Sequence, residues 1–156
     1  QFRKSDHLYQ VVKDLLALNP DLPNAQFIIE LTESTLIQNV EATINTLNML
    51  KTLGVSLSID DFGTGYSSLS RLKQFPIDQL KIDRSFIKDL LEDLNDKAIV
   101  AAIIAIAQEL NLKLVAEGVE LQGQADILLL NGCTLAQGFR YFKPMPLAEI
   151  LMLNIS

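Results

Sequence analysis

The sequence has a single cysteine, Cys133, and therefore cannot form a disulfide bond within the chain. A lone cysteine fits a reducing compartment, so a cytoplasmic location is expected. We expect this thiol to lie buried as an apolar side chain rather than to act as a nucleophile. The single histidine, His7, is expected on a helix surface, and no chemistry is assigned to it.

Positive charge and long apolar runs are also scarce. Nineteen acidic residues outnumber 13 lysines and arginines, and the net charge is -6. This balance argues against a nucleic-acid polymer as partner, because phosphate contacts need clustered basic side chains. The longest apolar run, residues 98–107, is shorter than the roughly 20 residues that span a bilayer, so no membrane segment is expected in this chain.

Apolar residues, by contrast, are plentiful enough to build a core. They make up 49% of the 156 residues, which predicts one compact unit over residues 1–156. No signal peptide is evident, the chain opens on Gln1, and its first methionine is Met49. We therefore expect a piece of a longer protein, and that parent protein can itself be membrane-anchored.

Apolar runs of strand length alternate with longer helical patterns, which predicts an α/β fold of repeated βα units with a parallel sheet. The expected strands cover residues 26–31, 55–60, 78–83, 112–117 and 133–139. The expected helices cover residues 6–18, 40–53, 96–110 and 122–130, with a short helix after Pro146. A TIM-like (β/α)8 barrel uses about 31 residues per unit, so the chain accounts for about five βα units of an incomplete barrel.

Each expected strand ends in a polar side chain. In residues 55–60, alternation places Ser56, Ser58 and Asp60 on one face and apolar side chains on the helix-packing face. In parallel α/β folds the carboxyl ends of the strands meet at one edge, where active sites gather. The side chains expected to converge there are Glu30, Asp60, Lys81, Glu117 and Gln137.

Three carboxylates aimed at one point repel one another, and a cation relieves the repulsion. The hard ions Mg²⁺ and Mn²⁺ suit such all-oxygen ligands. Because the strand is expected to end at Asp60, both Asp60 and Asp61 can turn into the pocket. Adjacent aspartates suit a two-metal site, with ions about 3.5–4 Å apart, as used in phosphodiester hydrolysis. Lys81 would stay charged there, orient a water and stabilise phosphate charge.

Plainer interpretations exist for the same residues. Asp60 and Asp61 could merely begin a glycine-rich turn, and Lys81 could pair with Asp83. Residues 61–63 spell the kinase magnesium tripeptide, but no HRD-type loop precedes them. An enolase-type barrel would also place carboxylates and a lysine at successive strand ends. It does not explain the sequence DDFGTGYSS or EGVE, and the other polar strand ends favour a metal site over a turn.

Four segments of the chain together resemble the EAL-domain family, in the family's order and over nearly the whole chain. They are IELTES at 29–34, residues 58–87 beginning SIDDFGTGYSS, LVAEGVE at 114–120 and GCTLAQGFRYFKPMP at 132–146. The resemblance implies a TIM-like barrel that serves bacterial signalling as a hydrolase. Its implied reaction is hydrolysis of cyclic di-GMP to linear pGpG by a phosphodiesterase that uses Mg²⁺ or Mn²⁺.

The resemblance also implies roles for single residues. Lys81 would position the attacking water, and Glu117 would serve as metal ligand or general base. Gln137 would bind substrate at the far rim of the site. The implied metal ligands are Glu30, Asp60, Asp61 and Glu117.

A further set of residues matches the family's loop and structural positions. Glu33 matches the glutamate that anchors the loop after Asp61, and Asp83 and Glu120 are expected to be structural. The loop resembles the segment that ties substrate binding to dimerisation, so a homodimer of the full domain is expected. Its residues are Phe62, Gly63, Thr64, Gly65, Tyr66, Ser67 and Ser68.

The chain also departs from the family. It lacks the name-giving Glu-Ala-Leu strand, which supplies a metal carboxylate and a substrate-contacting arginine, and it lacks the metal-binding asparagine of the next strand. Residues 1–156 are therefore expected to be a partial EAL domain, its C-terminal two-thirds. We expect this chain alone to be inactive or nearly so and its parent domain to be active. The alternative is a catalytically inactive cyclic di-GMP receptor, although the retained carboxylates and lysine argue against it.

Overall fold

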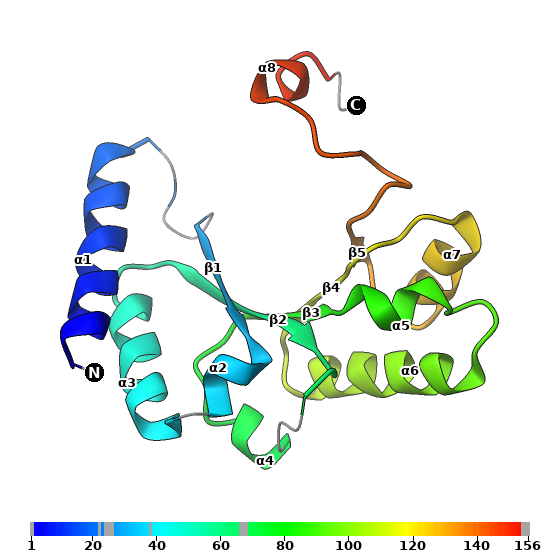
Figure 1. The fold of residues 1–156 in the computed structure, drawn as a ribbon, viewed down its shortest axis with the longest axis horizontal. Coiled ribbons are helices and arrows are strands. Elements are labelled where there is room, and N and C mark those ends of the chain that lie inside the picture. Colours follow the sequence, from blue (N-terminus) through cyan, green and yellow to red (C-terminus); the bar gives the residue numbers. More distant parts are fainter. Residues whose placement is uncertain (1, 22, 24–26, 38, 66–68, 154–156) are drawn as a thin grey trace.

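The computed structural model describes residues 2–21, 23, 27–37, 39–65 and 69–153. Within these residues five strands form one parallel sheet in the order β1-β2-β3-β4-β5, and helices connect successive strands along the chain (Figure 1). This arrangement confirms the expected α/β fold of βα units. The strands are β1 (Ile28–Thr32), β2 (Ser56–Phe62), β3 (Gln79–Ile82), β4 (Lys113–Ala116) and β5 (Leu135–Ala136).

The longer helices follow the expected pattern. The four are α1 (Phe2–Leu18), α3 (Val40–Lys51), α6 (Leu94–Glu109) and α7 (Gln122–Leu130). Four short helices complete the fold, namely α2 (Glu33–Ile37), α4 (Leu69–Leu72), α5 (Arg84–Lys88) and α8 (Leu147–Ile150). Only α8 among the short helices was expected. The others have five residues or fewer, too few to show an apolar repeat of 3.6 residues.

Two strands differ from the prediction. β2 continues to Phe62, two residues beyond the expected end. β5 has only two residues, whereas the expected strand covered 133–139. The reason is a turn, in which the backbone N–H groups of Tyr141 and Phe142 both donate to the Gly138 carbonyl and carry the chain away from β4.

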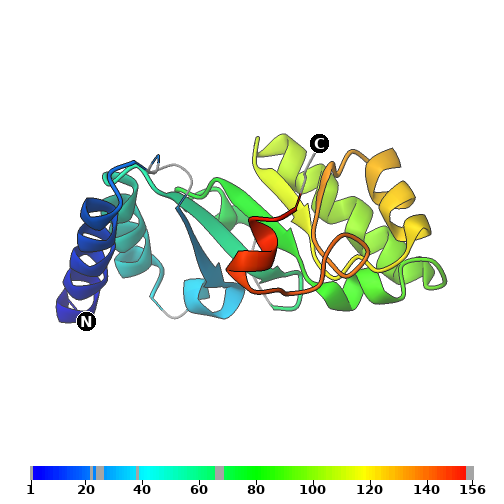
Figure 2. The same cartoon turned by 90° about the horizontal axis from the view of Figure 1, so that it is seen from above.

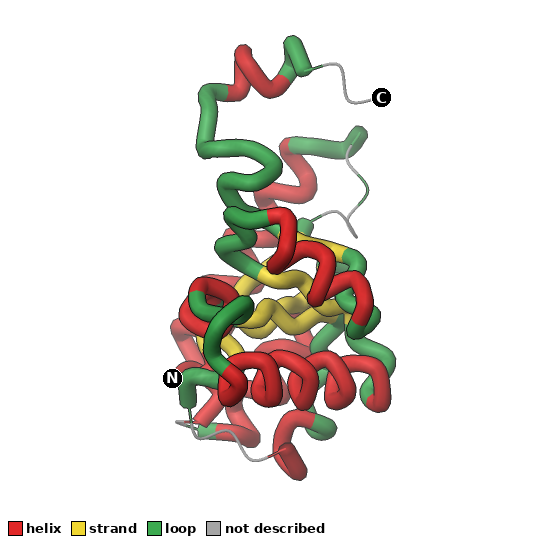
Figure 3. The backbone as a smooth tube through the Cα atoms, turned by 90° about the vertical axis from the view of Figure 1, so that its right-hand side faces the viewer, coloured by secondary structure: helices red, strands yellow, loops and turns green. Residues whose placement is uncertain are grey.

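Helices pack along the sheet. α3 contacts β2, α6 contacts β3 and β4, and α1 packs on α3. Figures 1 and 2 show α1 and α3 side by side at one end of the molecule, with α6 and α7 at the other. Figure 3 shows the segment after β5 leading away from the strands toward α8. Among the described residues, none of the helices combines the length and the apolar character that crossing a bilayer requires.

The expected alternation in β2 is confirmed. Val55, Leu57 and Ile59 are buried in the apolar core, at 1% exposure or less. Ser58, on the opposite face, is equally buried and accepts a hydrogen bond from Gln79 Nε2 at 3.2 Å. The face that carries the polar strand ends is therefore lined with polar side chains over more than one layer.

Cys133 and His7 also lie where the sequence predicted. Cys133 is 4% exposed, and burial raises the pKa of its thiol, so little thiolate is present to react. His7 is exposed on α1.

Asp78 ties three elements together at the amino ends of the strands. It lies just before β3, and its carboxylate accepts hydrogen bonds from Lys51 Nζ at 2.7 and 2.8 Å. The same carboxylate accepts the backbone N–H of Leu57 at 2.8 Å. It therefore joins the end of α3 to β2 and β3.

Replacing Asp78 with alanine is expected to lower the free energy of unfolding by about 1–3 kcal/mol, because the buried N–H of Leu57 loses its acceptor. The Lys51 pair contributes less, below about 1 kcal/mol, since its side chains are 34% and 35% exposed. Asp78→Asn keeps an acceptor oxygen and should recover most of the loss in urea unfolding, with the exposed Glu92→Ala as control. Equal losses for both Asp78 variants would contradict this account.

Candidate metal and catalytic site

Lys81 lies at the centre of a cluster of carboxylates. Its Nζ is 2.9 Å from Glu30 Oε1, 3.0 Å from Asp60 Oδ1 and 2.6 Å from Glu117 Oε1. These acids come from β1, from β2 and from the residue after β4, so the carboxyl ends of the strands converge as the sequence predicted. Lys81 does not pair with Asp83 in this arrangement, because Asp83 caps the N-terminus of α5.

The charge of Lys81 is maintained by its neighbours. The residue is only 5% exposed, and burial by itself would lower the pKa of the ammonium group. Close ion-pair contacts with Glu117, Glu30 and Asp60 outweigh this effect and raise the pKa above its usual value. Lys81 is therefore a fixed cation and a hydrogen-bond donor at neutral pH, and it cannot accept a proton there.

A bulge in β2 brings Asp60 and Asp61 to the same face. The register between β2 and β3 shifts between Ile59 and Phe62, and Asp61 has a φ of +54°, the left-handed region that non-glycine residues rarely adopt. In a regular strand the two carboxylates would point to opposite faces. The expectation that the strand ends at Asp60 is therefore wrong, and the bulge instead turns both side chains to one side.

Glu117 is held between Lys81 and Gln137. Gln137 Nε2 donates to Glu117 Oε1 at 2.6 Å, so the predicted rim glutamine also orients a carboxylate of the cluster. Burial raises the pKa of Glu117, Lys81 offsets part of that rise, and the charges of Asp60 and Glu30 add to it. Glu117 is consequently the carboxylate of this cluster that combines a raised pKa with direct contact to the lysine.

Asp61 and Asp83 have pKa values shifted in opposite directions. Burial, the Asp83 carboxyl group and the charge of Asp60 raise the pKa of Asp61. Burial would also raise the pKa of Asp83, but hydrogen bonds from the hydroxyl and backbone N–H of Ser85 hold it below its usual value. Asp83 thus caps α5 as an anion next to Asp61.

The donor set fits a hard divalent cation. One ligand oxygen each from Asp60, Asp61 and Glu117 can be chosen so that all lie within 4.8 Å of one another. Over the part of the chain that the structure describes, Asp60 Oδ1 is a buried side-chain oxygen without a hydrogen bond of good geometry, although Lys81 Nζ lies 3.0 Å away. One lysine cannot balance four carboxylates, and oxygen-rich clusters of this kind are what Mg²⁺ and Mn²⁺ bind.

Glu33 anchors the loop that follows Asp61. It is 3% exposed, and its Oε2 accepts the backbone N–H groups of Gly63 and Gly65, each at 3.1 Å. Gly63 has a φ of +100°, which favours glycine, and a Cβ on Gly65 would lie 2.8 Å from Glu33 Oε1, so a larger residue there would displace the Glu33 carboxylate. Thr64 donates its hydroxyl hydrogen to the Asp61 carbonyl. The predicted loop residues Tyr66, Ser67 and Ser68 lie outside the described residues.

Sequence reasoning missed one buried polar residue near the site, Gln124. It is 2% exposed on α7, and it hydrogen-bonds the backbone of Glu120. Glu120 itself is exposed. A glutamine at the start of a helix is a known capping signal, but the usual serine or threonine partner three residues earlier is replaced by Leu121.

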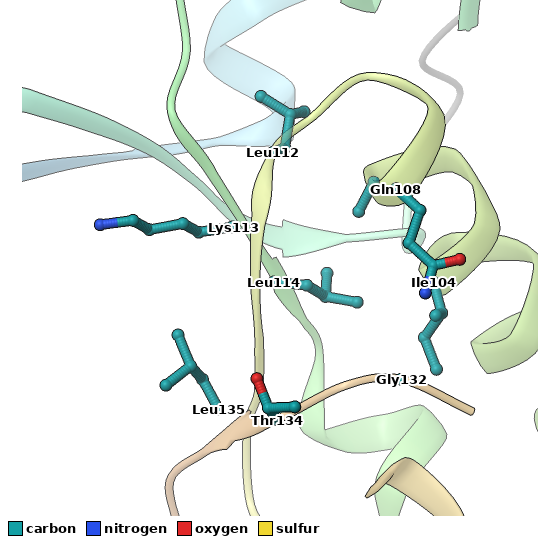
Figure 4. A pocket seen from close by; sticks show the side chains of 9 residues that line it. Ile104, Gln108, Leu112, Lys113, Leu114, Gly132, Thr134 and Leu135 are labelled. Carbon is teal, nitrogen blue, oxygen red and sulfur yellow. The ribbon is translucent and has the colours of Figure 1, made fainter. Parts of the chain in front are cut away.

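A pocket of about 190 Å³ lies away from the carboxylates, between α6 and the amino ends of β4 and β5 (Figure 4). Its lining includes Gln108, Lys113 and Thr134. The pocket is smaller than the roughly 300 Å³ at which ligand pockets usually begin. A pocket of this volume is therefore a weak candidate for a ligand site.

Comparison with known proteins agrees with this geometry. The EAL domain family model matches residues 4–144. The cyclic di-GMP phosphodiesterase NbdA of Pseudomonas aeruginosa is 53% identical over 122 residues, which cover 78% of this chain and 16% of NbdA. The chain thus spans a small part of this curated relative.

Solved structures give the same family. The PaMucR phosphodiesterase in complex with c-di-GMP matches with a TM-score of 0.84 and 47% identity, over 88% of this chain and 56% of that one. Klebsiella pneumoniae BlrP1, solved with manganese and cy-diGMP, matches with a TM-score of 0.77 and 36% identity, over 86% and 34%. With its family-model match, its sequence identity and its fold in agreement, the chain belongs to the EAL domain family.

Proposed function

We propose that the domain containing this chain hydrolyses cyclic di-GMP to linear pGpG with Mg²⁺ or Mn²⁺ as cofactor. The observation that carries the proposal is a buried lysine on β3 within 3.0 Å of carboxylates from β1, β2 and the residue after β4, beside Asp61. The names of the similar proteins support the same substrate. Because the chain spans only part of those proteins, the activity is proposed for the whole domain.

Four carboxylates of the chain would hold the cations. Asp60, Asp61 and Glu117 would be ligands of the ions, with Glu30 completing the set from β1. Divalent cations in hydrolases withdraw charge from a phosphoryl oxygen and acidify the attacking water. The family's Glu-Ala-Leu carboxylate and its asparagine ligand are absent from residues 1–156, so another segment would have to supply them.

Two side chains would act directly on the attacking water and the phosphate. The water oxygen would bond to phosphorus, the P–O3′ bond would break, and the 3′ oxygen would leave as a hydroxyl group with the proton that Glu117 takes from the water. Lys81, which stays charged, would orient the water and stabilise the phosphate charge by hydrogen bonding. Glu117, with its raised pKa, would accept the proton of the water, and Gln137 would hold Glu117 in place and contact the substrate.

The loop anchored by Glu33 would couple this site to a second copy of the domain. The full domain is accordingly proposed to work as a homodimer, in the cytoplasm, where it would remove the second messenger. A catalytically inactive cyclic di-GMP receptor is the alternative, and it would bind the dinucleotide without forming product.

The full-length gene product containing residues 1–156 is expected to convert cyclic di-GMP to pGpG with Mn²⁺, as followed by chromatography. Asp60→Asn should lower kcat by at least about a hundredfold, because a carboxylate that would hold the cations is lost. The exposed Asp126→Asn is the matched control and should leave kcat unchanged.

The 156-residue chain alone is expected to show no turnover in the same assay. Robust hydrolysis by it would show that the Glu-Ala-Leu strand is dispensable. Tight binding without product by the full-length protein would instead favour the receptor.

Saturating Mn²⁺ is expected to raise the Tm of the chain near neutral pH, by an amount that corresponds to about 2.7 kcal/mol at a hundred times Kd. Glu117 has a raised pKa when folded, so its protonated form favours folding below its ordinary pKa, and this contribution is lost as pH rises through the folded pKa. The rise in Tm caused by Mn²⁺ should therefore grow with rising pH and shrink in acid, where protons compete with Mn²⁺ for the carboxylates. Scanning calorimetry checks this, with Asp61→Asn reducing the effect and Asp126→Asn preserving it.

Lys81→Met is expected to lower the free energy of unfolding near pH 7 by about 3 kcal/mol, because the buried carboxylates lose their counter-charge. The raised pKa of Lys81 means that its stabilisation is fully present below the ordinary lysine pKa and is lost only in strong alkali. In the variant the loss should shrink near pH 4, where the carboxylates become protonated. Urea unfolding at both pH values checks this against the exposed Lys73→Met, and a loss independent of pH would contradict it.

A further inference from the structure

Gln124 makes a complete set of hydrogen bonds although it is almost wholly buried, at 2% exposure. Its Oε1 accepts the backbone N–H groups of Glu120 and Leu121, both at 2.9 Å. Its Nε2 donates to the carbonyl oxygens of Ile87 at 2.9 Å and Lys88 at 3.3 Å. A carboxamide has two N–H groups and an oxygen with two lone pairs, so its full capacity is used.

These four bonds join two segments that both begin at the carboxylate cluster. One segment is α5, which starts two residues after the end of β3, the strand that carries Lys81. The other is the loop 117–121, which follows β4 and begins with Glu117. Gln124 therefore connects the far end of α5 to the far end of the loop.

The near end of the same loop is held by the backbone. The N–H of Glu117 donates to the Ile82 carbonyl at 3.2 Å, and the N–H of Val119 donates to the Gln137 carbonyl at 3.0 Å. The Val119 carbonyl accepts the N–H of Arg140 at 3.0 Å. The loop is thus fixed to its neighbours at the near end by backbone pairing and at the far end by one side chain.

We propose that Gln124 is a positioning residue for the carboxylate site: its carboxamide ties the loop 117–121 to α5 and thereby fixes Glu117 against Lys81. Gln124 itself is placed to act through the loop rather than to touch cation or substrate. An apolar side chain of the same size cannot replace it, because the N–H groups of Glu120 and Leu121 would lose this acceptor and the Lys88 carbonyl would lose this donor, although the Ile87 carbonyl also accepts the N–H of Leu90. The inference rests on the proposed function only for experiments that measure turnover of cyclic di-GMP.

Gln124→Glu distinguishes the bonds that Gln124 accepts from the loop from the bonds that it donates to α5. A glutamate keeps an acceptor for the two N–H groups, so the cap on α7 is retained. It loses both donors and sets a carboxylate against the carbonyl oxygens of Ile87 and Lys88, so the connection to α5 is broken. Gln10→Glu on α1 is the matched control, since Gln10 is exposed and the chemical change is the same. Gln124→Leu removes the bonds to the loop and the bonds to α5 together.

The experiment uses the full-length gene product with Mn²⁺ and cyclic di-GMP, well below the Tm of each variant. Gln124→Glu is expected to lower kcat by about tenfold and to weaken Mn²⁺ binding in calorimetry by a similar factor, with KM changed less than about twofold. Gln124→Leu should lose at least as much, and Gln10→Glu should match the wild type. A lower Tm with unchanged kcat and Mn²⁺ affinity would reduce Gln124 to a stabilising residue and overturn the proposal.

A second measurement needs no variant. If the loop links Gln124 to Glu117, Mn²⁺ bound at Glu117 should slow hydrogen exchange at the Glu120 and Leu121 N–H groups in the wild type, because coupling between sites is reciprocal. Unchanged exchange at both groups, under saturating Mn²⁺, would overturn the proposal. Absence of turnover in the wild type would refute the proposed function alone, since Mn²⁺ affinity and exchange still report on Gln124.

Discussion

The ion cluster around Lys81 is the interaction on which the rest of this structure depends. A buried ammonium group and several carboxylates can share one site only if their charges nearly cancel, because desolvating an unpaired charge costs several kcal/mol. Lys81 reaches acids contributed by β1, β2 and the residue after β4, so those elements must keep their spacing for the cluster to exist. One lysine leaves net negative charge, and this surplus makes the site suitable for cations. The same charged side chains therefore affect both the stability of the fold and the proposed binding of cations.

The surroundings of the cluster fix the directions of its side chains. A bulge in β2 turns Asp60 and Asp61 to one side, and it does so by placing Asp61 in a left-handed backbone conformation. The buried carboxylate of Glu33 holds the next turn through two backbone N–H groups. Such strained and buried polar features persist only where neighbouring contacts maintain them. The acidic cluster, and with it the proposed metal site, is thus held in place by the fold itself.

Glutamines complete the arrangement on the side of β4. Gln137 fixes one oxygen of Glu117 directly, whereas Gln124 acts on the backbone that carries Glu117. Neutral amides suit this task because they donate and accept hydrogen bonds without adding charge to an already charged site. Glu117, whose pKa is raised, is thus supported both at its side chain and at the loop that carries it. That combination fits a group that exchanges a proton during catalysis.

The sequence by itself determined the element types and the strand-end residues. Alternation along β2 and the helical repeat of α1 are local patterns, and the polar residue at the end of each strand follows from where the apolar run stops. The end of β2, the two-residue β5, the short helices and the roles of Gln124 and Gln137 were decided only by tertiary structure. A bulge depends on the register of a neighbouring strand, and a buried glutamine depends on which backbone groups other elements leave unpaired. Neither the bulge nor the bonds of a buried glutamine can be read from the adjacent residues, because partners in other elements lie about 20 to 40 positions away in the chain. The Gln124 bond to the Ile87 carbonyl, for example, spans 37 positions.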